Sequence, residues 1–165
     1  MAIEIRRARP EEYEEAGRVT ALAYREFVPP GDDDWEGYLD VIADVADRAD
    51  RTLVLVAVED GRVLGTATLE LSERIEQQDP PLAPHEVEVR MVGVDPAARG
   101  RGIGRRLMEA SIEEARALGK TELLLHTTTR MRVAQRMYES MGFQRGPDRP
   151  ITENFTLLSY RLPLR

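Results

Sequence analysis

Hydrophobic and polar positions in the first fifty residues predict one strand followed by two helices. Ile3–Arg7 alternates apolar and polar side chains, which is the period of a strand. Pro10 and the glutamates after it predict a helix that runs to about Arg25, because proline and acidic residues suit a first helical turn. A second helix is predicted to begin at Asp32–Asp34. Its apolar stripe consists of Trp35, Leu39, Ile42 and Val45.

The rest of the chain predicts further strands separated by two more helices. Thr52–Glu59 is rich in β-branched residues, and Asp60-Gly61 is a hairpin signal that predicts an antiparallel partner at Val63–Leu71. Residues 72–85 are polar and contain three prolines, which predicts a loop. The elements after the loop are strand Glu86–Val94, helix Gly102–Leu118, strand Glu122–Thr127, helix Arg130–Met141 and strands Phe143–Arg145 and Phe155–Leu162. This order predicts an α/β (α+β) fold, a mixed sheet of about six to seven strands with flanking helices.

Length and composition narrow the class of protein. The 165 residues have the length of one domain, and we take residues 1–165 as a single domain. With 42% hydrophobic and 32% charged residues the chain has a soluble composition, and no stretch is apolar for long enough to span a membrane. The sequence begins without the features of a signal peptide, so we expect a cytoplasmic location. The absence of cysteine excludes thiolate chemistry, and the net charge of −7 disfavours nucleic acid as a partner.

The predicted strand Glu86–Val94 changes its pattern part-way along. Glu86, Glu88 and Arg90 share one side of it, but beyond Arg90 the same side becomes apolar at Val92 and Val94. Either both faces of the strand become buried there, or a β-bulge resets its register. A bulge would leave backbone N–H and C=O groups free to bond a ligand.

A glycine-rich turn follows this strand and opens the next helix. The sequence Arg99-Gly100-Arg101-Gly102-Ile103-Gly104-Arg105-Arg106 predicts an anion site, because the first N–H groups of a helix lack internal partners and glycine lets an anion approach. The spacing differs from the G-x-G-x-x-G pattern of dinucleotide-binding folds. Gly119-Lys120-Thr121 lacks the earlier glycine of a P-loop and follows a helix, so we reject it as a nucleotide site.

Three segments together resemble the GNAT superfamily of N-acetyltransferases. Arg99-x-x-Gly102-x-Gly104 resembles the acetyl-CoA motif of that family. Val92-Gly93-Val94-Asp95-Pro96 resembles its pantetheine-binding strand. Ala134-x-x-Met137-Tyr138-Glu139-x-Met141-Gly142-Phe143 resembles its second signature, except that the Asn many relatives place three residues earlier is Met131 here. One hydrogen bond to the cofactor is therefore expected either to be missing or to come from Thr128 or Thr129.

The resemblance implies a GNAT-like acyl-CoA N-acyltransferase fold with acetyl-CoA as co-substrate and no metal. The backbone amides of Arg101–Arg105 would hold the pyrophosphate, Val92–Val94 would pair with the pantetheine arm, and Tyr138 would lie near the thioester sulfur. The residues expected to bind the cofactor are Val92, Gly93, Val94, Arg99, Gly100, Arg101, Gly102, Ile103, Gly104, Arg105, Ala134 and Tyr138.

Acetyl transfer to an amine needs a proton acceptor for the amine and a proton donor for the departing thiolate. Glu86 and Glu88 are the candidate bases, although a solvated strand face would have the same pattern. Tyr138 is the candidate acid, with packing as its alternative role, and its deprotonation is expected to lower activity above about pH 9–10. His85 and His126 have no clustered partners in the sequence, so neither indicates a metal site. A histidine in a short strand such as His126 is interpreted as structural.

The acceptor is expected to be a primary amine of a small molecule or peptide. Segments Phe27–Trp35 and Ser72–Pro84 would flank its cleft in the family fold, where Asp32, Asp33, Asp34 and Glu36 either attract a cation or begin a solvated helix. A non-catalytic sensor of CoA or acyl-CoA is the alternative function. Gln144–Arg145 and Phe155–Leu162 are expected to form exposed edges, which suggests a homodimer.

Overall fold

The computed structural model describes residues 2–28, 33–76, 79–153 and 155–164. Its described strands form one eight-stranded mixed sheet in the order β1-β2-β3-β4-β5-β8-β6, with β7 also paired to β8. The strands are β1 (Glu4–Arg7), β2 (Thr52–Glu59), β3 (Arg62–Glu70), β4 (Glu86–Val94), β5 (Glu122–Thr128), β6 (Gln144–Arg145), β7 (Arg149–Thr152) and β8 (Phe155–Pro163). The α-helices are α1 (Tyr13–Arg25), α2 (Asp33–Ala43), α3 (Val45–Arg48), α4 (Ile103–Ala117) and α5 (Arg132–Ser140). Short 3₁₀ turns at Pro10–Glu12 and Pro96–Ala98 precede α1 and α4.

The mixed α/β fold is confirmed, with two departures from the predicted elements. The sheet has one strand more than expected, because the short β7, which contains Pro150, carries no strand pattern. The predicted second helix is interrupted at Asp44, whose side chain accepts a hydrogen bond from the Asp47 N–H and starts α3. Val45 therefore belongs to α3 rather than to the stripe of α2.

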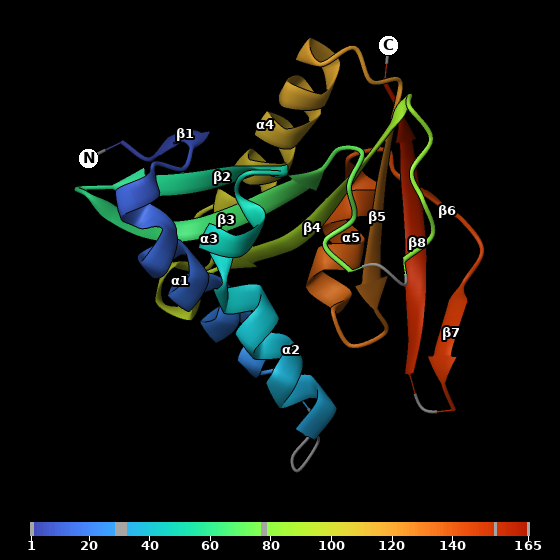
Figure 1. Cartoon of the computed structure of the whole chain (residues 1–165), viewed down its shortest axis with the longest axis horizontal. Coiled ribbons are helices and arrows are strands. Elements are labelled where there is room, and N and C mark those ends of the chain that lie inside the picture. The colour runs from blue at the N-terminus through green and yellow to red at the C-terminus, as the bar shows by residue number, and fades with distance from the viewer. Residues whose placement is uncertain (1, 29–32, 77–78, 154, 165) are drawn as a thin grey trace.

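Helices cover both faces of the sheet (Figure 1). One apolar core lies between α1, α3 and strands β2 and β3, and is formed by Ala16, Val19, Val45, Val54, Val56, Val58 and Val63. The larger core on the opposite face contains Ile103, Leu107 and Met108 of α4 and Tyr138 of α5, packed on residues of β2 to β5 and β8. The strands are thus held between two apolar layers, which fixes the positions of their ends.

Strands β4 and β5 are parallel neighbours that separate part-way along. Their pairing runs from Glu86 opposite Glu122 to Val89 opposite Leu125, while β4 continues to Val94 and β5 to Thr128. On its other side β4 contains a bulge, because Thr68 pairs with Arg90 but Thr66 pairs with Gly93. Met91 within the bulge has a φ of 56°, in the left-handed region. Of the two interpretations of the strand pattern, the bulge is confirmed.

The expected exposed edges are wrong for β8. This strand lies inside the sheet, between β5 on one side and β6 and β7 on the other, and its Leu158 and Tyr160 are buried. Of the apolar run that suggested an interface, Leu158 and Tyr160 belong to the core, and Phe155 and Leu157 line a cavity. Among the described helices, none has the length and apolar character needed to cross a membrane.

Gly17 allows α1 to cross α2 closely, and its replacement tests this packing. A Cβ there would lie 1.9 Å from the Ala43 carbonyl oxygen, which cannot move without separating the helices. We expect Gly17→Ala to lower the free energy of unfolding by about 3 kcal/mol. Gly37 is the matched control, because a Cβ at this helical glycine meets no described atom within 4 Å. Gly37→Ala should stabilise by up to about 1 kcal/mol, and equal effects of the two variants in urea unfolding would contradict the packing argument.

Candidate active site

The glycine-rich turn forms an open helix N-terminus. Gly102 caps α4 with a φ of 75°, Gly100 has a φ of 82°, and a Cβ at either position would meet no described atom within 4 Å. The Arg106 N–H donates to the Gly102 carbonyl, so the N–H groups of the preceding helical residues lack an intrahelical acceptor. Open space at the two glycines, together with helix N–H groups that lack an acceptor, suits an anion.

Three arginines of the turn already contact other parts of the protein. Arg101 Nη1 and Nη2 donate to the carboxylate of Glu59 at the end of β2, at 3.1 and 2.6 Å. Arg99 pairs with Glu26 at the end of α1, and Arg105 donates to Ser140 Oγ at 3.0 Å. Arg99 and Arg101 are thus paired with carboxylates, and the backbone amides at the helix start are the candidate groups to bind an anion.

The bulged half of β4 lies against both the turn and α1. A Cβ on Gly93 would lie 2.9 Å from Ala23 Cβ, so this glycine is needed for α1 to pack on the strand. A Cβ on Gly104 would lie 3.7 Å from Val94 Cγ2 and 3.9 Å from Met137 Sδ. The start of α4 therefore lies next to the end of β4 and to α5.

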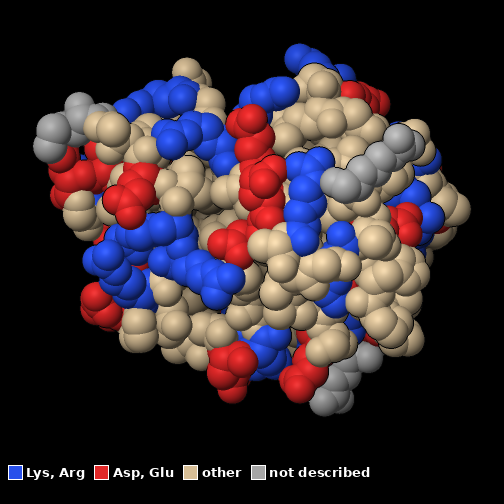
Figure 2. All heavy atoms as spheres, turned by 90° about the horizontal axis from the view of Figure 1, so that it is seen from above, with Lys and Arg blue, Asp and Glu red and all other residues tan. Residues whose placement is uncertain are grey.

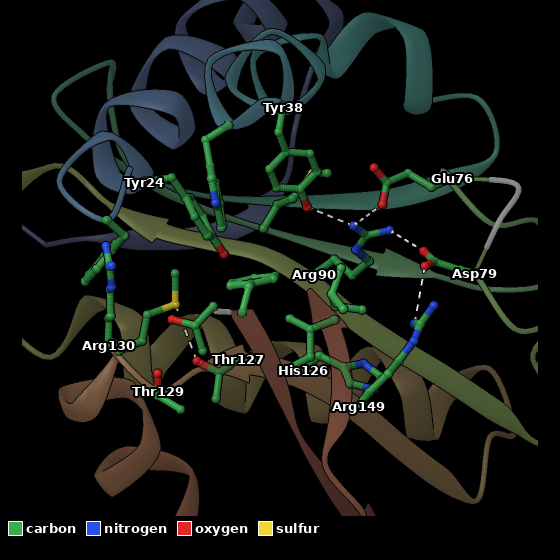
Figure 3. A pocket seen from close by; sticks show the side chains of 18 of the residues that line it. Tyr24, Tyr38, Glu76, Asp79, Arg90, His126, Thr127, Thr129, Arg130 and Arg149 are labelled. Atoms are coloured by element: carbon green, nitrogen blue, oxygen red, sulfur yellow. Dashed lines mark hydrogen bonds and ion pairs between the residues drawn. The ribbon is translucent and has the colours of Figure 1, made fainter. Parts of the chain in front are cut away.

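A cavity of about 750 Å³ opens beside the point where β4 and β5 separate (Figure 3). Its size is that of a small-molecule site. Met91 of β4 and His126, Thr127 and Thr128 of β5 line it, and each comes after the last residue pair between these strands. Its aromatic lining consists of Tyr24, Phe27, Trp35, Tyr38 and Phe155. Trp35 of α2 makes an edge contact with Phe155 of β8, with ring centroids 5.1 Å apart, which joins the two sides of the cavity.

Arg90 organises the polar side of the cavity. Its guanidinium donates to the Tyr38 hydroxyl at 2.8 Å, to Glu76 at 3.0 Å and to Asp79 at 3.0 Å (Figure 3). It also donates to the fully buried Glu70 at 3.4 Å. Burial opposes its charge, but these neighbours raise the pKa of Arg90 above its usual value. Arg90 therefore holds α2, β3 and the segment after β3 around the cavity.

Glu88 and His126 form a hydrogen-bonded pair in the cavity lining, in which only Glu88 is buried. Glu88 is only 4% exposed; its Oε2 lies 3.2 Å from His126 Nδ1, and its Oε1 accepts from Arg74 Nη2 at 3.0 Å. Burial favours the neutral acid, but the His126 hydrogen bond and the Arg74 charge outweigh it and hold the pKa of Glu88 below its usual range. Glu88 is thus an ionised hydrogen-bond acceptor.

Tyr138 lies in the core next to this site. Its ring packs on Phe143 and Tyr160, with centroids 5.7 and 5.9 Å away, and it is 6% exposed. It is not among the described residues that line the cavity, whereas Tyr24 is. Burial raises the pKa of Tyr138 to about 12, so its hydroxyl stays protonated at neutral pH. The expectation that deprotonation of Tyr138 lowers activity above about pH 9–10 is therefore wrong, because this pKa lies higher.

Residues 12–143 match the sequence pattern of the Acetyltransferase (GNAT) family. The chain belongs to the GNAT family. It is 35% identical over 85 residues to mycothiol acetyltransferase of Thermobispora bispora, covering 52% of this chain and 28% of that protein. It is 47% identical over 62 residues to the N-alpha-acetyltransferase RimI of Mycobacterium tuberculosis, covering 38% of this chain and 37% of that protein. The chain thus spans less than two fifths of the length of either relative.

A solved structure shares the fold along the whole chain. The structure of yncA from Salmonella typhimurium with its cofactor acetyl-CoA has a TM-score of 0.71 and 24% identity, and the match covers 100% of this chain and 95% of that chain. The eight-stranded sheet with its separated β4 and β5 is thus a GNAT fold.

The residues of this GNAT chain fit an acetyl-CoA molecule. The open helix N-terminus at Gly102 suits a pyrophosphate, and the bulge in β4 frees backbone groups for an amide-containing arm. Thr128 Oγ1 is buried without a hydrogen-bond partner among the described residues, at the position expected to replace the asparagine of other relatives. Ala134 is half-buried on α5 and packs against the larger core.

The structure separates the two glutamates that were expected to act as bases. Glu86 is not part of the cavity lining in the described structure; its Oε1 accepts from the Ala83 N–H at 2.7 Å. It shares the far end of β4 with His85 and Glu122, with candidate ligand atoms within 4.8 Å, but Glu122 already pairs with Arg161. The expectation that Glu86 serves the acceptor site is therefore corrected, and Glu88 remains.

The sequence predicted the two segments that flank the cavity but not the contacts that their residues make. Phe27 and Trp35, and Arg74, Glu76 and Asp79, do line the cavity from the two segments expected to flank it. Asp32 lies outside the described residues, as do the side chains of Asp33 and Asp34, and Glu36 forms an ion pair with Arg25 at 3.7 Å. The functional partners of Arg90 and His126 come from distant segments, and only a predicted strand register would have revealed them.

Acidic and basic side chains are interspersed on the face shown in Figure 2. On the face in Figure 2, acidic side chains lie between groups of basic ones instead of leaving one continuous basic patch. Together with the net charge of −7, this distribution opposes binding along a phosphate backbone.

Proposed function

We propose that the chain transfers the acetyl group of acetyl-CoA to a primary amine bound in the cavity. The observation that carries this proposal is the separation of β4 and β5 after Val89 and Leu125. The cavity residues Met91 and His126 lie directly beyond this point, and the end of β4 contacts the open turn of α4. The cofactor turn and the acceptor cavity are thus adjacent.

The chain contributes binding, polarisation and proton transfer to the reaction. The backbone N–H groups of Arg101–Arg105 hold the pyrophosphate, and Val92–Val94 bond the pantetheine arm. The N–H of Val92 polarises the thioester carbonyl, which makes its carbon open to attack. Acetyl-CoA supplies the activated acetyl group. Tyr138 donates a proton to the departing sulfur, and the Glu88–His126 pair accepts a proton from the amine.

The cavity indicates the chemistry of the acceptor. Carboxylates of Glu76, Asp79 and Glu88 lie at its polar side, each paired with Arg74 or Arg90, so this side offers hydrogen-bonding groups to a polar acceptor rather than an unpaired negative charge. Another part of its lining is aromatic and includes Tyr24 and Trp35. A primary amine that carries an adjacent aromatic or aliphatic group fits this division, whether it belongs to a small molecule or to a peptide end.

Turnover against a panel of amines tests the function. We expect free thiol release from acetyl-CoA with at least one of an arylalkylamine, a polyamine, an aminoglycoside, a lysine derivative and a peptide with a free amino end. The peptide is included because the relative RimI is an N-alpha-acetyltransferase. Tight acetyl-CoA binding without turnover of any amine would favour the sensor alternative. A cytoplasmic location, a homodimer and the absence of a metal stay predictions from the sequence.

A further inference from the structure

The hydrogen bond between Glu88 and His126 has a fixed direction, which the sequence did not indicate. An ionised carboxylate only accepts hydrogen bonds, and Glu88 is ionised because His126 and Arg74 stabilise its charge. The hydrogen bond of 3.2 Å to His126 Nδ1 therefore places a proton on Nδ1. In a neutral imidazole the other nitrogen, Nε2, then carries the free lone pair.

The position of His126 gives this lone pair access to a reacting amine. His126 is the first residue of β5 beyond the pairing with β4, and its side chain lines the cavity (Figure 3). It is 23% exposed, against 5% for the side chain of Glu88. Both Glu88 oxygens already accept hydrogen bonds, one from His126 and one from Arg74. Glu88 is thus poorly placed to take a proton, whereas His126 is reachable from the cavity.

We infer that His126 is the general base that deprotonates the acceptor amine, and that Glu88 is a positioning residue that fixes its tautomer. This inference rests on the proposed acetyl transfer. His126 Nε2 takes one proton from the ammonium group, which leaves the amine with a lone pair. That lone pair forms the new N–C bond, and the C–S bond breaks with its electron pair on sulfur. The sulfur takes a proton from Tyr138, which is restored by the second proton lost from the nitrogen, and His126 releases its proton to solvent.

Several titratable or charged side chains line the cavity together with His126. They are Arg74, Glu76 and Asp79 after β3, Glu88 and Arg90 on β4, Arg130 after β5, Arg149 on β7, and Tyr24 and Tyr38 on α1 and α2. Glu88 is the group with a direct hydrogen bond to the ring. Replacing Glu88 is therefore expected to have the largest effect on which ring nitrogen of His126 carries the proton.

Nitrogen NMR of the protein without acetyl-CoA reads the tautomer directly. The chain has two histidines, so His85→Asn and His126→Asn assign the signals. We expect neutral His126 to carry its proton on Nδ1 in the wild type and on Nε2 in Glu88→Gln, whose amide donates to Nδ1. A wild-type His126 with its proton on Nε2 would overturn the inference, and this result does not depend on turnover.

Kinetics of the same variants separate catalysis from structure. His126→Asn keeps a donor toward Glu88 but lacks a base, so kcat should fall about 10²–10⁴-fold with little change in the KM for acetyl-CoA. The rise of kcat/KM with pH that the base causes in the wild type should be absent in this variant. Glu88→Gln should also lose kcat, because the tautomer is wrong. His85→Asn is the control and should match the wild type, since His85 lies at the other end of β4.

The outcomes distinguish this inference from the proposed function. If the wild type acetylates amines and folded His126→Asn retains kcat and the pH-dependent rise, the base is another group and the inference is wrong. His126→Gln provides the same comparison if the asparagine variant fails to fold. If no amine is acetylated by the wild type, the proposed function fails, and the base assignment falls with it even where NMR finds the Nδ1 proton.

Discussion

Replacing Tyr138 with phenylalanine is expected to lower kcat by about 10²–10⁴-fold, the contribution of a positioned general acid. Phenylalanine keeps the ring that packs on Phe143 and Tyr160 and removes only the hydroxyl. The fold and the affinity for acetyl-CoA should therefore change little. Steady-state kinetics with acetyl-CoA as the varied substrate measures kcat and KM separately.

The pH profile of the wild type provides a second check on Tyr138. Because burial raises the pKa of Tyr138 to about 12, its hydroxyl remains protonated up to about pH 11. The donor is thus present below this pKa and is lost only above it, so it should cause no decline of kcat up to about pH 10. Tyr160→Phe is the matched control, since Tyr160 is a buried tyrosine of the same aromatic group. A raised KM with kcat preserved in Tyr138→Phe would assign the residue to packing along the pantetheine arm.

Replacing Gly104 with valine is expected to lower acetyl-CoA affinity by roughly 10²-fold or more. Hydrogen bonds to a charged group contribute about 1.5–3 kcal/mol each, and a branched side chain at the helix start would keep the pyrophosphate from the N–H groups. A Cβ at Gly104 meets its nearest described atoms at 3.7 and 3.9 Å, so the fold should tolerate it. Gly104→Ala is a milder variant that should bind more weakly than the wild type and more tightly than the valine variant.

Calorimetry of CoA binding measures this effect without turnover. Gly37→Val is the control, because Gly37 is another helical glycine with open space around its Cβ position, on α2. Its affinity for CoA should equal that of the wild type. Unchanged affinity in folded Gly104→Val would contradict the placement of the pyrophosphate at the start of α4.

Local sequence patterns predicted most of the fold because they are set by local physics. The hairpin at Asp60-Gly61 forms with φ values of 52° and 75°, which this dipeptide adopts readily. The strand Glu86–Val94 has its predicted bounds, and its change of pattern beyond Arg90 is a real bulge. The helix start at Gly102 likewise follows from residues that are adjacent in the sequence.

The parts that escaped prediction depend on contacts between distant residues. Glu88 and His126 are 38 positions apart, and they meet because β4 and β5 pair in parallel with Val89 opposite Leu125. Single-sequence patterns do not fix that register. For the same reason Glu86 and Glu88 looked equivalent in the sequence. Glu86 begins β4 away from the cavity, whereas Glu88 lines the cavity.

Acetyl transfer from a labelled cofactor tests the central claim most directly. The protein is incubated with acetyl-CoA carrying a ¹³C-labelled acetyl group and with the best amine of the panel, and free thiol and labelled amide are quantified by mass spectrometry. The account predicts one labelled N-acetyl product for each thiol released by the wild type. At an acetyl-CoA concentration near the wild-type Kd, it predicts much less of both products with Gly104→Val. Thiol release without a labelled amide, or an unmodified amine beside saturating bound acetyl-CoA, would contradict it.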